Sequence, residues 1–145
     1  MICYLSLGSN LGDRSLNLQK ARKLLEEKIG TLKAVSSEHE TEPWGFRSNN
    51  KFLNQVVAVE TDLPPEEILS LTQQIERAIG RKDKTAGNNY KDRIIDVDLL
   101  LAGNIKMKTD KLTLPHPSML KRRFVMEPLS EIAPDLVKDC NYDGC

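Results

Sequence analysis

The stretch that most constrains this chain runs from residue 93 to residue 101, Arg-Ile-Ile-Asp-Val-Asp-Leu-Leu-Leu. Apolar residues fill it and Gly103-Asn104 closes it, which predicts a β-strand that ends in a turn. Side chains alternate between the two faces of a strand, so Asp96 and Asp98 should share one face, roughly 6.5–7 Å apart along the strand. The opposite face should be an apolar stripe suited to a core, formed by Ile95, Val97, Leu99 and Leu101.

The acidic pair has two interpretations. Carboxylates at this spacing can both turn toward one hard cation, or toward two cations that lie side by side. The plainer interpretation is an antiparallel strand with a wet outer face, on which both aspartates are simply solvated. Aspartate is depleted from strands, and Ile94 and Leu100 flank the pair on its own face, which favours a metal site. The rest of the chain must then supply something for a metal to hold.

Composition narrows the class of protein. The chain has 145 residues, 39% hydrophobic and 29% charged, which is typical of a globular protein and fits a single domain over residues 1–145. Its 21 basic and 21 acidic residues cancel, so no global field recruits nucleic acid or a membrane. Cys3 lies in an apolar run, which suits a reducing compartment, and no signal peptide or membrane-spanning run is evident. We therefore expect a cytoplasmic protein without nucleic-acid or membrane partners.

Apolar periodicity divides the chain into strands and two helices. The helices are expected from Asp13 or Ser15 to Ile29, and from the Pro64-Pro65 pair to Gly80. The longer strands are expected at residues 2–7, 32–41, 52–61 and 93–101. Beyond Phe124, a short apolar run and a terminal turn are expected. This β-α-β-β-α-β order is typical of an α+β, ferredoxin-like fold.

Two further segments carry side chains suited to ligands. Phe52 and Asn54 share a strand face, where a ring beside an amide could stack a flat heterocycle and bind its edge; the alternative is a core phenylalanine and an edge asparagine. Residues 81–93 are polar and hold five cations. They form either a solvated loop or, because they lead directly into the acidic strand, a cradle for a metal-bound polyphosphate.

Two weaker candidates remain. His116 lies between two prolines and is expected to be exposed; beside the basic residues 121–123 it could join an anion site, although a lone histidine is more often structural. The glycine turn at residues 8–12 either binds a phosphate through backbone N–H groups or simply connects a strand to a helix. Neither nucleotide-loop motif is present there.

Taken together, five short motifs follow one another in order: Gly-Ser-Asn-Leu-Gly at 8–12, Phe-Leu-Asn at 52–54, the acidic strand, Pro-His-Pro at 115–117 and Arg-Arg-Phe-Val at 122–125. In this combination the chain resembles the 6-hydroxymethyl-7,8-dihydropterin pyrophosphokinases, folate-pathway enzymes that move pyrophosphate from ATP to a pterin alcohol. The resemblance covers residue 1 to about residue 137. It implies a ferredoxin-like enzyme, expected to be a monomer, that uses ATP, the hydroxymethyl dihydropterin and two Mg²⁺ ions.

The resemblance also implies a role for individual residues. Asp96 and Asp98 would hold the two Mg²⁺ ions and, with Arg81 and Arg93, would form the catalytic group. The pterin ring would lie between Phe52 and Phe124, and its polar edge would meet Thr41, Gly45 and Asn54. ATP would be bound by Gln73, Glu76, Lys84, Arg93, Leu99, Thr113, His116 and Arg122.

The chain departs from the family pattern in residues 81–93. Lys91-Asp92 stands where the family usually has Gly-Pro, Tyr90 stands in place of a Trp, and Asp83 occupies a position often held by Arg. Loops 8–13, 42–51 and 81–92 are expected to be flexible covers of the site. The competing hypothesis is a non-catalytic ferredoxin-like module that binds nucleotide, because one fold hosts many functions.

Overall fold

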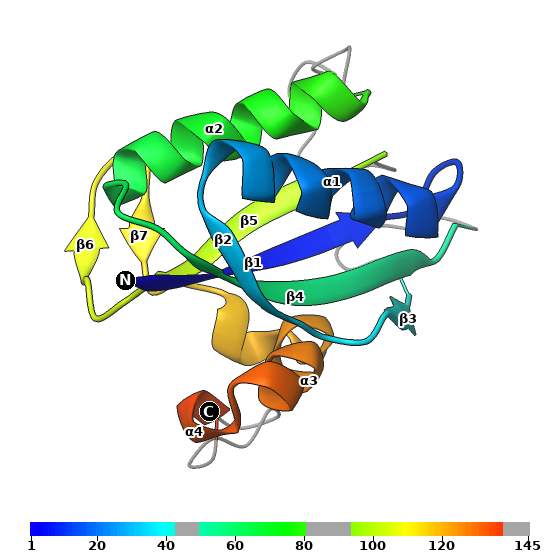
Figure 1. Cartoon of the computed structure of the whole chain (residues 1–145). Coiled ribbons are helices and arrows are strands. Elements are labelled where there is room, and N and C mark those ends of the chain that lie inside the picture. The colour runs from blue at the N-terminus through cyan, green and yellow to red at the C-terminus, as the bar shows by residue number, and fades with distance from the viewer. Residues whose placement is uncertain (43–49, 81–93, 138–145) are drawn as a thin grey trace.

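The computed structural model describes residues 1–42, 50–80 and 94–137. One antiparallel sheet forms its centre, with three of its helices packed on the two sheet faces (Figure 1). The helices are α1 (Arg14–Lys28), α2 (Pro65–Ile79), α3 (Arg123–Ile132) and α4 (Pro134–Val137), with a 3-10 turn η1 (Met119–Lys121) before α3. The strands are β1 (Ile2–Ser9), β2 (Thr31–Val35), β3 (His39–Thr41), β4 (Phe52–Glu60), β5 (Asp96–Ala102), β6 (Met107–Lys108) and β7 (Thr113–Leu114).

The sheet has the strand order β2-β4-β1-β5, and β3 pairs with the other end of β4. This arrangement confirms the expected β-α-β-β-α-β, ferredoxin-like plan. The single strand expected over residues 32–41 is instead two strands, β2 and β3. The interruption lies at Ser36, which donates its N–H to the carbonyl of Val56 at 2.9 Å. Its Oγ accepts the N–H of Val56, also at 2.9 Å, so a side chain replaces the backbone carbonyl that would have continued the ladder.

Helices α1 and α2 cover one face of the sheet (Figure 1). Both begin and end close to the expected residues: Asp13 caps α1 through its side chain, and Gly80 ends α2. The apolar stripe of each helix faces the strands, as its spacing predicted. The core between them includes Cys3, Leu5, Leu7, Leu18, Leu25, Val57, Val59, Ile68, Ile75, Val97 and Leu99.

Helix α3 covers part of the opposite face and was not expected from the sequence. Its buried residues Val125, Met126 and Leu129 are spaced as one helical face and pack on Val56 and Leu100. Pro128, inside the helix, suggested a terminal turn because proline usually ends a helix. The apolar contact with β4 stabilises the helix in spite of the proline.

A bulge in β5 changes the predicted apolar stripe. Leu5 of β1 pairs with Leu99, whereas Tyr4 pairs with Leu101, so Leu100 is the extra residue. Val97 and Leu99 face α1 and α2 as predicted. Leu101 packs instead with the α3 side, as does Leu100, and its predicted place in the stripe was wrong.

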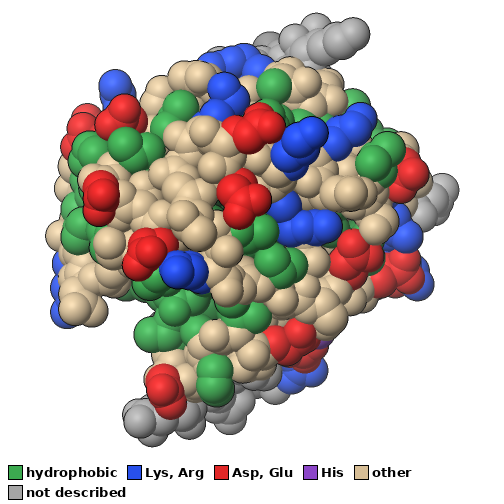
Figure 2. Space-filling view, in the orientation of Figure 1, with side chains coloured by type: hydrophobic (Ala, Val, Ile, Leu, Met, Phe, Trp, Pro, Cys, Tyr) green, Lys and Arg blue, Asp and Glu red, His purple; other side chains and the backbone are tan. Residues whose placement is uncertain are grey.

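The surface mixes charges of both signs. Figure 2 shows basic and acidic side chains interspersed over the face turned toward the viewer, in keeping with the zero formal net charge. Over residues 1–42, 50–80 and 94–137, none of the helices has the length and apolar character needed to cross a membrane.

Candidate active site

Strand register brings the candidate ligand-binding residues into rows across the sheet. Gly8 of β1 lies directly opposite Asn54 of β4 on one side and Asp96 of β5 on the other. Ser6 is opposite Asp98 in the same way. Residues directly opposite each other in a sheet point to the same face, so the amide and both carboxylates lie on the face that α3 shares. The predicted heterocycle and metal residues, more than 40 positions apart in sequence, are therefore neighbours with one glycine between them.

Gly8 keeps the space between these side chains open. A Cβ atom at this position would lie 3.3 Å from Asn54 Oδ1 and 3.5 Å from a ring carbon of Phe52. The backbone at the centre of the row, at Gly8, therefore carries no side chain, and we call this bare stretch the floor of the row. Such a floor allows a flat ligand to approach the strand closely.

Asn54 is buried and held in one orientation. Its Nδ2 donates to Thr41 Oγ1 at 2.6 Å and to the carbonyl of His39 at 3.4 Å. The amide nitrogen is thereby turned toward β3, while Oδ1 lies on the Gly8 side. The structure brings Thr41, Phe52 and Asn54 together as expected.

The second predicted aromatic, Phe124, lies in the first turn of α3. The guanidinium carbon of Arg122 stands 5.5 Å from its ring centroid, within reach of a cation–π interaction. The rings of Phe52 and Phe124 are both half-buried. Arg122 therefore links the predicted pterin side of the site to the predicted phosphate side.

The acidic pair lies at the beginning of β5. Asp98 is exposed and Asp96 is half-buried. Between them, the N–H of Val97 donates to Glu76 Oε2 of α2 at 2.9 Å. Glu76, expected about the nucleotide, is 6% exposed and fixes the strand that carries both aspartates. Gln73, one turn earlier on α2, is exposed.

A cavity of about 250 Å³ lies beside β5 and joins four residues expected about the metal and ATP: Asp98, Leu99, Thr113 and His116. Its lining also includes the turn 109–112, with Asp110 and Lys111. Sequence reasoning missed these two residues. The available signal was the polar turn immediately before Thr113, which delivers a cation to the same groove.

His116 is half-buried rather than exposed, and its surroundings favour the neutral ring. Its Nδ1 accepts the N–H of Ser118 at 3.1 Å, which leaves Nε2 to carry the proton. Burial lowers the pKa of His116 below 6.5, and the charge of Arg122 lowers it further. The ring can therefore donate one hydrogen bond without carrying a full charge.

The lowered pKa of His116 predicts a pH-dependent stability. The unfolded chain binds the proton more tightly than the folded one, so this stabilisation is present above pH 6.5 and is lost as the pH falls toward the folded-state pKa. Urea unfolding from about pH 7.5 down to about pH 5.5 should show a steeper loss of stability for the natural protein than for His116→Asn. NMR titration should place the His116 pKa below 6.5 without ligand and higher with Mg-ATP. Equal slopes for the two proteins would contradict the assignment.

The glycine turn after β1 is held from within. Asn17 Nδ2 donates to the carbonyl of Leu11 at 2.9 Å and to Ser9 Oγ at 3.1 Å. Asp13 Oδ1 accepts the N–H of Leu16 at 3.1 Å, placing a negative charge at the helix N-terminus. An acidic cap repels phosphate, which favours the plain strand–helix connection at this turn.

Several predicted residues lie outside the described part of the chain: Gly45, Arg81, Lys84 and Arg93. The same is true of Asp83 and of residues 90–92, where the chain departs from the family pattern. Among the described residues, no group of three or more His, Cys, Asp or Glu could hold a metal ion. Two carboxylates that are neighbours on one strand face still suit a hard cation whose remaining ligands are phosphate oxygens and water.

The fold and this arrangement define a ferredoxin-like α+β protein in which one sheet face joins a pair of carboxylates on β5 to an aromatic ring and an oriented amide on β4. The chain belongs to the 7,8-dihydro-6-hydroxymethylpterin-pyrophosphokinase family, whose model matches residues 4–134. This finding confirms the family and the enzyme class expected from the sequence motifs.

The names of similar curated proteins agree with this family assignment. The chain is 51% identical over 134 residues to the 2-amino-4-hydroxy-6-hydroxymethyldihydropteridine pyrophosphokinase of Porphyromonas gingivalis, covering 92% of this chain and 91% of that protein. It is 42% identical over 139 residues to the enzyme of the same name from Bacillus subtilis, covering 95% and 81%.

A solved structure shares the fold. The Plasmodium falciparum HPPK-DHPS wild type with SDX-DHP superposes with a TM-score of 0.69 at 18% identity. The match covers 92% of this chain and 40% of that longer one. At this identity the likeness concerns the fold alone.

Proposed function

We propose that this chain transfers pyrophosphate from ATP to the hydroxyl group of 6-hydroxymethyl-7,8-dihydropterin, releasing AMP, at the face where Asn54, Gly8 and Asp96 lie in one row. That row is the observation that carries the proposal. In it an oriented amide, which could bind a heterocycle, lies beside a carboxylate pair, which could hold a cation, and Asp98 also lines the cavity that contains Thr113 and His116. The family's reaction supplies the chemistry.

The bond changes are simple. The pterin hydroxyl oxygen attacks the β-phosphorus of ATP, and the bond from that phosphorus to the oxygen bridging to the α-phosphorus breaks. AMP leaves with the bridging oxygen, and the hydroxyl proton passes to solvent. Asp96 and Asp98 would hold Mg²⁺, which would supply neutralisation of phosphate charge and a lower pKa for the attacking hydroxyl. The protein needs no nucleophile of its own, because positioning and charge neutralisation lower the barrier.

Each residue set has a defined task in this proposal. Asp96 and Asp98 would hold two Mg²⁺ ions. Phe52 and Phe124 would enclose the pterin ring, with Thr41, Gly45 and Asn54 at its polar edge. The cavity beside β5 would take the nucleotide, contacted by Gln73, Glu76, Lys84, Arg93, Leu99, Thr113, His116 and Arg122, with Arg81 and Arg93 as catalytic cations.

We also propose that the protein acts in the cytoplasm as a monomer. The thiol of Cys3 is fully buried, and burial raises its pKa to about 11, which suits a residue that stays reduced. The balanced charge gives the chain no general attraction for nucleic acid. Size-exclusion chromatography with light scattering should give a mass near 16.4 kDa.

The direct test is product analysis. Purified protein with ATP, Mg²⁺ and 6-hydroxymethyl-7,8-dihydropterin should form AMP and the pterin diphosphate in equal amounts, because each transfer yields one of each. Omitting the pterin is the control and should suppress AMP formation. Release of ADP would overturn the proposal. Binding of Mg-ATP without any AMP would support the non-catalytic module instead.

A further inference from the structure

Strand β3 is too short and too polar to be held by the core. It consists of His39, Glu40 and Thr41 and pairs only along one end of β4 in the described structure. Thr41 nevertheless orients the amide of Asn54. Apart from its backbone pairing with β4, β3 is therefore held by polar contacts of its side chains, which point alternately to the two sheet faces.

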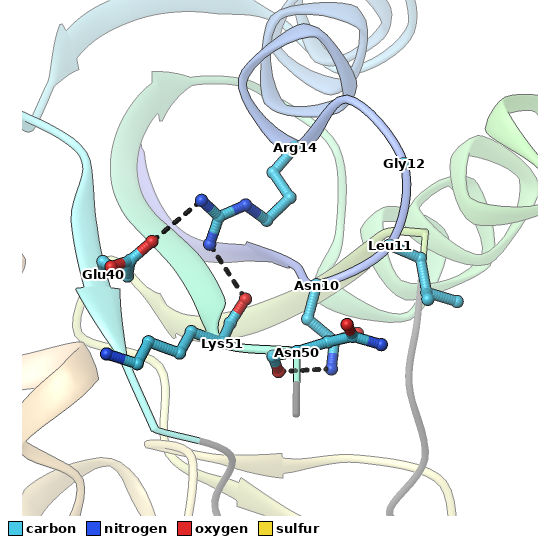
Figure 3. A pocket seen from close by; sticks show the side chains of 7 residues that line it. All are labelled: Asn10, Leu11, Gly12, Arg14, Glu40, Asn50 and Lys51. Carbon is cyan, nitrogen blue, oxygen red and sulfur yellow. Dashed lines mark hydrogen bonds and ion pairs between the residues drawn. The ribbon is translucent and has the colours of Figure 1, made fainter. Parts of the chain in front are cut away.

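On the α1 face, one arginine holds β3 and the beginning of β4 together. Arg14 pairs with Glu40 Oε2 at 2.8 Å and donates to the carbonyl of Lys51 at 2.9 Å, as Figure 3 shows. Asn10 Nδ2 donates to the neighbouring carbonyl of Asn50 at 3.1 Å. These contacts border a pocket of about 380 Å³ and fix the residue that precedes Phe52.

On the opposite face, a carboxylate of α3 makes the corresponding contact. Glu131 Oε1 accepts the N–H of Ser37 at 2.8 Å, and its carboxylate also accepts the hydroxyl of Ser37 and the Nε2 of His39. The Ser37 N–H holds the pKa of Glu131 below its usual value, so the carboxylate stays ionised at neutral pH. These contacts connect segments about 90 positions apart in sequence.

Helix geometry connects this contact to the predicted pterin pocket. Glu131 and Phe124 are seven residues apart on α3, which is close to two turns, so both lie on the same side of the helix. The apolar residues Val125, Met126 and Leu129 keep the helix on the sheet, but apolar packing is non-directional. The hydrogen bonds of Glu131 are directional and can fix the rotation of that side toward β3.

We propose that Glu131 and His39 form a clasp that positions the two walls of the pterin pocket. One wall is β3 with Thr41, which orients Asn54 of β4, and the other is α3 with Phe124. Glu131 and His39 are positioning residues and do not touch the substrate. This inference rests on the proposed function.

The first test is the Glu131→Ala variant in steady-state kinetics. Alanine keeps the helix but removes all three contacts, so the KM for the pterin should rise roughly tenfold, with kcat and the KM for ATP within about twofold of the natural values. Glu60→Ala is the matched control. Glu60 pairs with Lys33 at 3.6 Å at the other end of β4, and its loss should leave both KM values unchanged.

A conservative pair of variants at His39 separates positioning from bulk. His39→Gln retains an N–H donor for Glu131 and should keep the pterin KM within about threefold. His39→Leu removes that contact but leaves the two Ser37 contacts, so its pterin KM should lie between those of His39→Gln and Glu131→Ala. This pair also decides the question if Glu131→Ala does not fold.

Three outcomes would overturn the clasp. The pterin KM could be unchanged in Glu131→Ala, or His39→Gln and His39→Leu could have the same pterin KM. The third is a general defect in Glu131→Ala, in which kcat falls, both KM values rise and the melting temperature is lowered. Failure of the proposed function is a different result, because the natural protein itself would then form no AMP.

Discussion

Asp96→Ala and Asp98→Ala are each expected to reduce the rate of AMP formation on the order of a thousandfold or more, because each removes a carboxylate that we propose holds the cation on the phosphates. The structure places both side chains on the open sheet face, outside the two apolar clusters. Exposed Asp98 should therefore change the free energy of unfolding by less than about 0.5 kcal/mol on replacement. The measurement is the initial rate at saturating ATP and pterin, with thermal unfolding recorded on the same samples.

Asp62→Asn is the control for this experiment, since Asp62 is exposed in the connection between β4 and α2. It should leave the rate unchanged. A tenth or more of the natural rate in both Asp96→Ala and Asp98→Ala would contradict the metal-holding role. Unfolding of both variants would indicate a structural role for the pair. Calorimetric titration of Mg-ATP adds a second readout, in which both variants should lose affinity.

Local patterns were sufficient to predict the elements that form around the helix-covered core. The spacing of Leu18, Ala21 and Leu25 predicted α1, and the two prolines and Gly80 marked the ends of α2. These signals work because caps and periodicity depend on neighbouring residues alone. The order of the elements then limited the topology to very few arrangements.

The errors arose where a long-range contact overrides a local preference. Ser36 interrupts a strand because its hydroxyl meets the backbone of Val56, and α3 tolerates Pro128 because apolar residues dock it on β4. The bulge at Leu100 redirects Leu101 to the α3 side. None of these partners is close in sequence, so no local pattern could reveal them.

In the candidate site, too, local patterns predicted single residues, whereas the way the residues come together depends on long-range contacts. Asp96, Asp98, Phe52 and Asn54 became candidates through their strand parity and the family motifs. Their adjacency across Gly8 depends on the register of three strands, which the sequence alone leaves open. Lys111 and Glu131 were missed because each lies on an element whose place next to the site follows only from the tertiary fold.

Gly8→Val is expected to lower kcat/KM for the pterin on the order of a hundredfold while the KM for ATP changes little. A Cβ atom at Gly8 would already lie 3.3 Å from Asn54 Oδ1, and the two methyl groups of valine would add bulk beside Asn54 and Phe52. Valine is well suited to a central strand, so the loss should come from the blocked floor of the pocket and not from unfolding. The overpacking should cost about 1–3 kcal/mol of stability.

Two further variants serve as an intermediate substitution and a control for Gly8→Val. Gly8→Ala adds only the Cβ atom and should fall between the natural protein and Gly8→Val, because it requires Asn54 to shift by only a few tenths of an ångström. Ala34→Val adds comparable bulk on the edge strand β2, away from the row, and should leave kcat/KM unchanged. If Gly8→Val turned over the pterin at the natural rate, the heterocycle could not lie over the floor between Asn54 and Asp96. The pterin would then have to bind elsewhere on the sheet, and the proposed alignment of its hydroxyl with the acidic pair would fail with it.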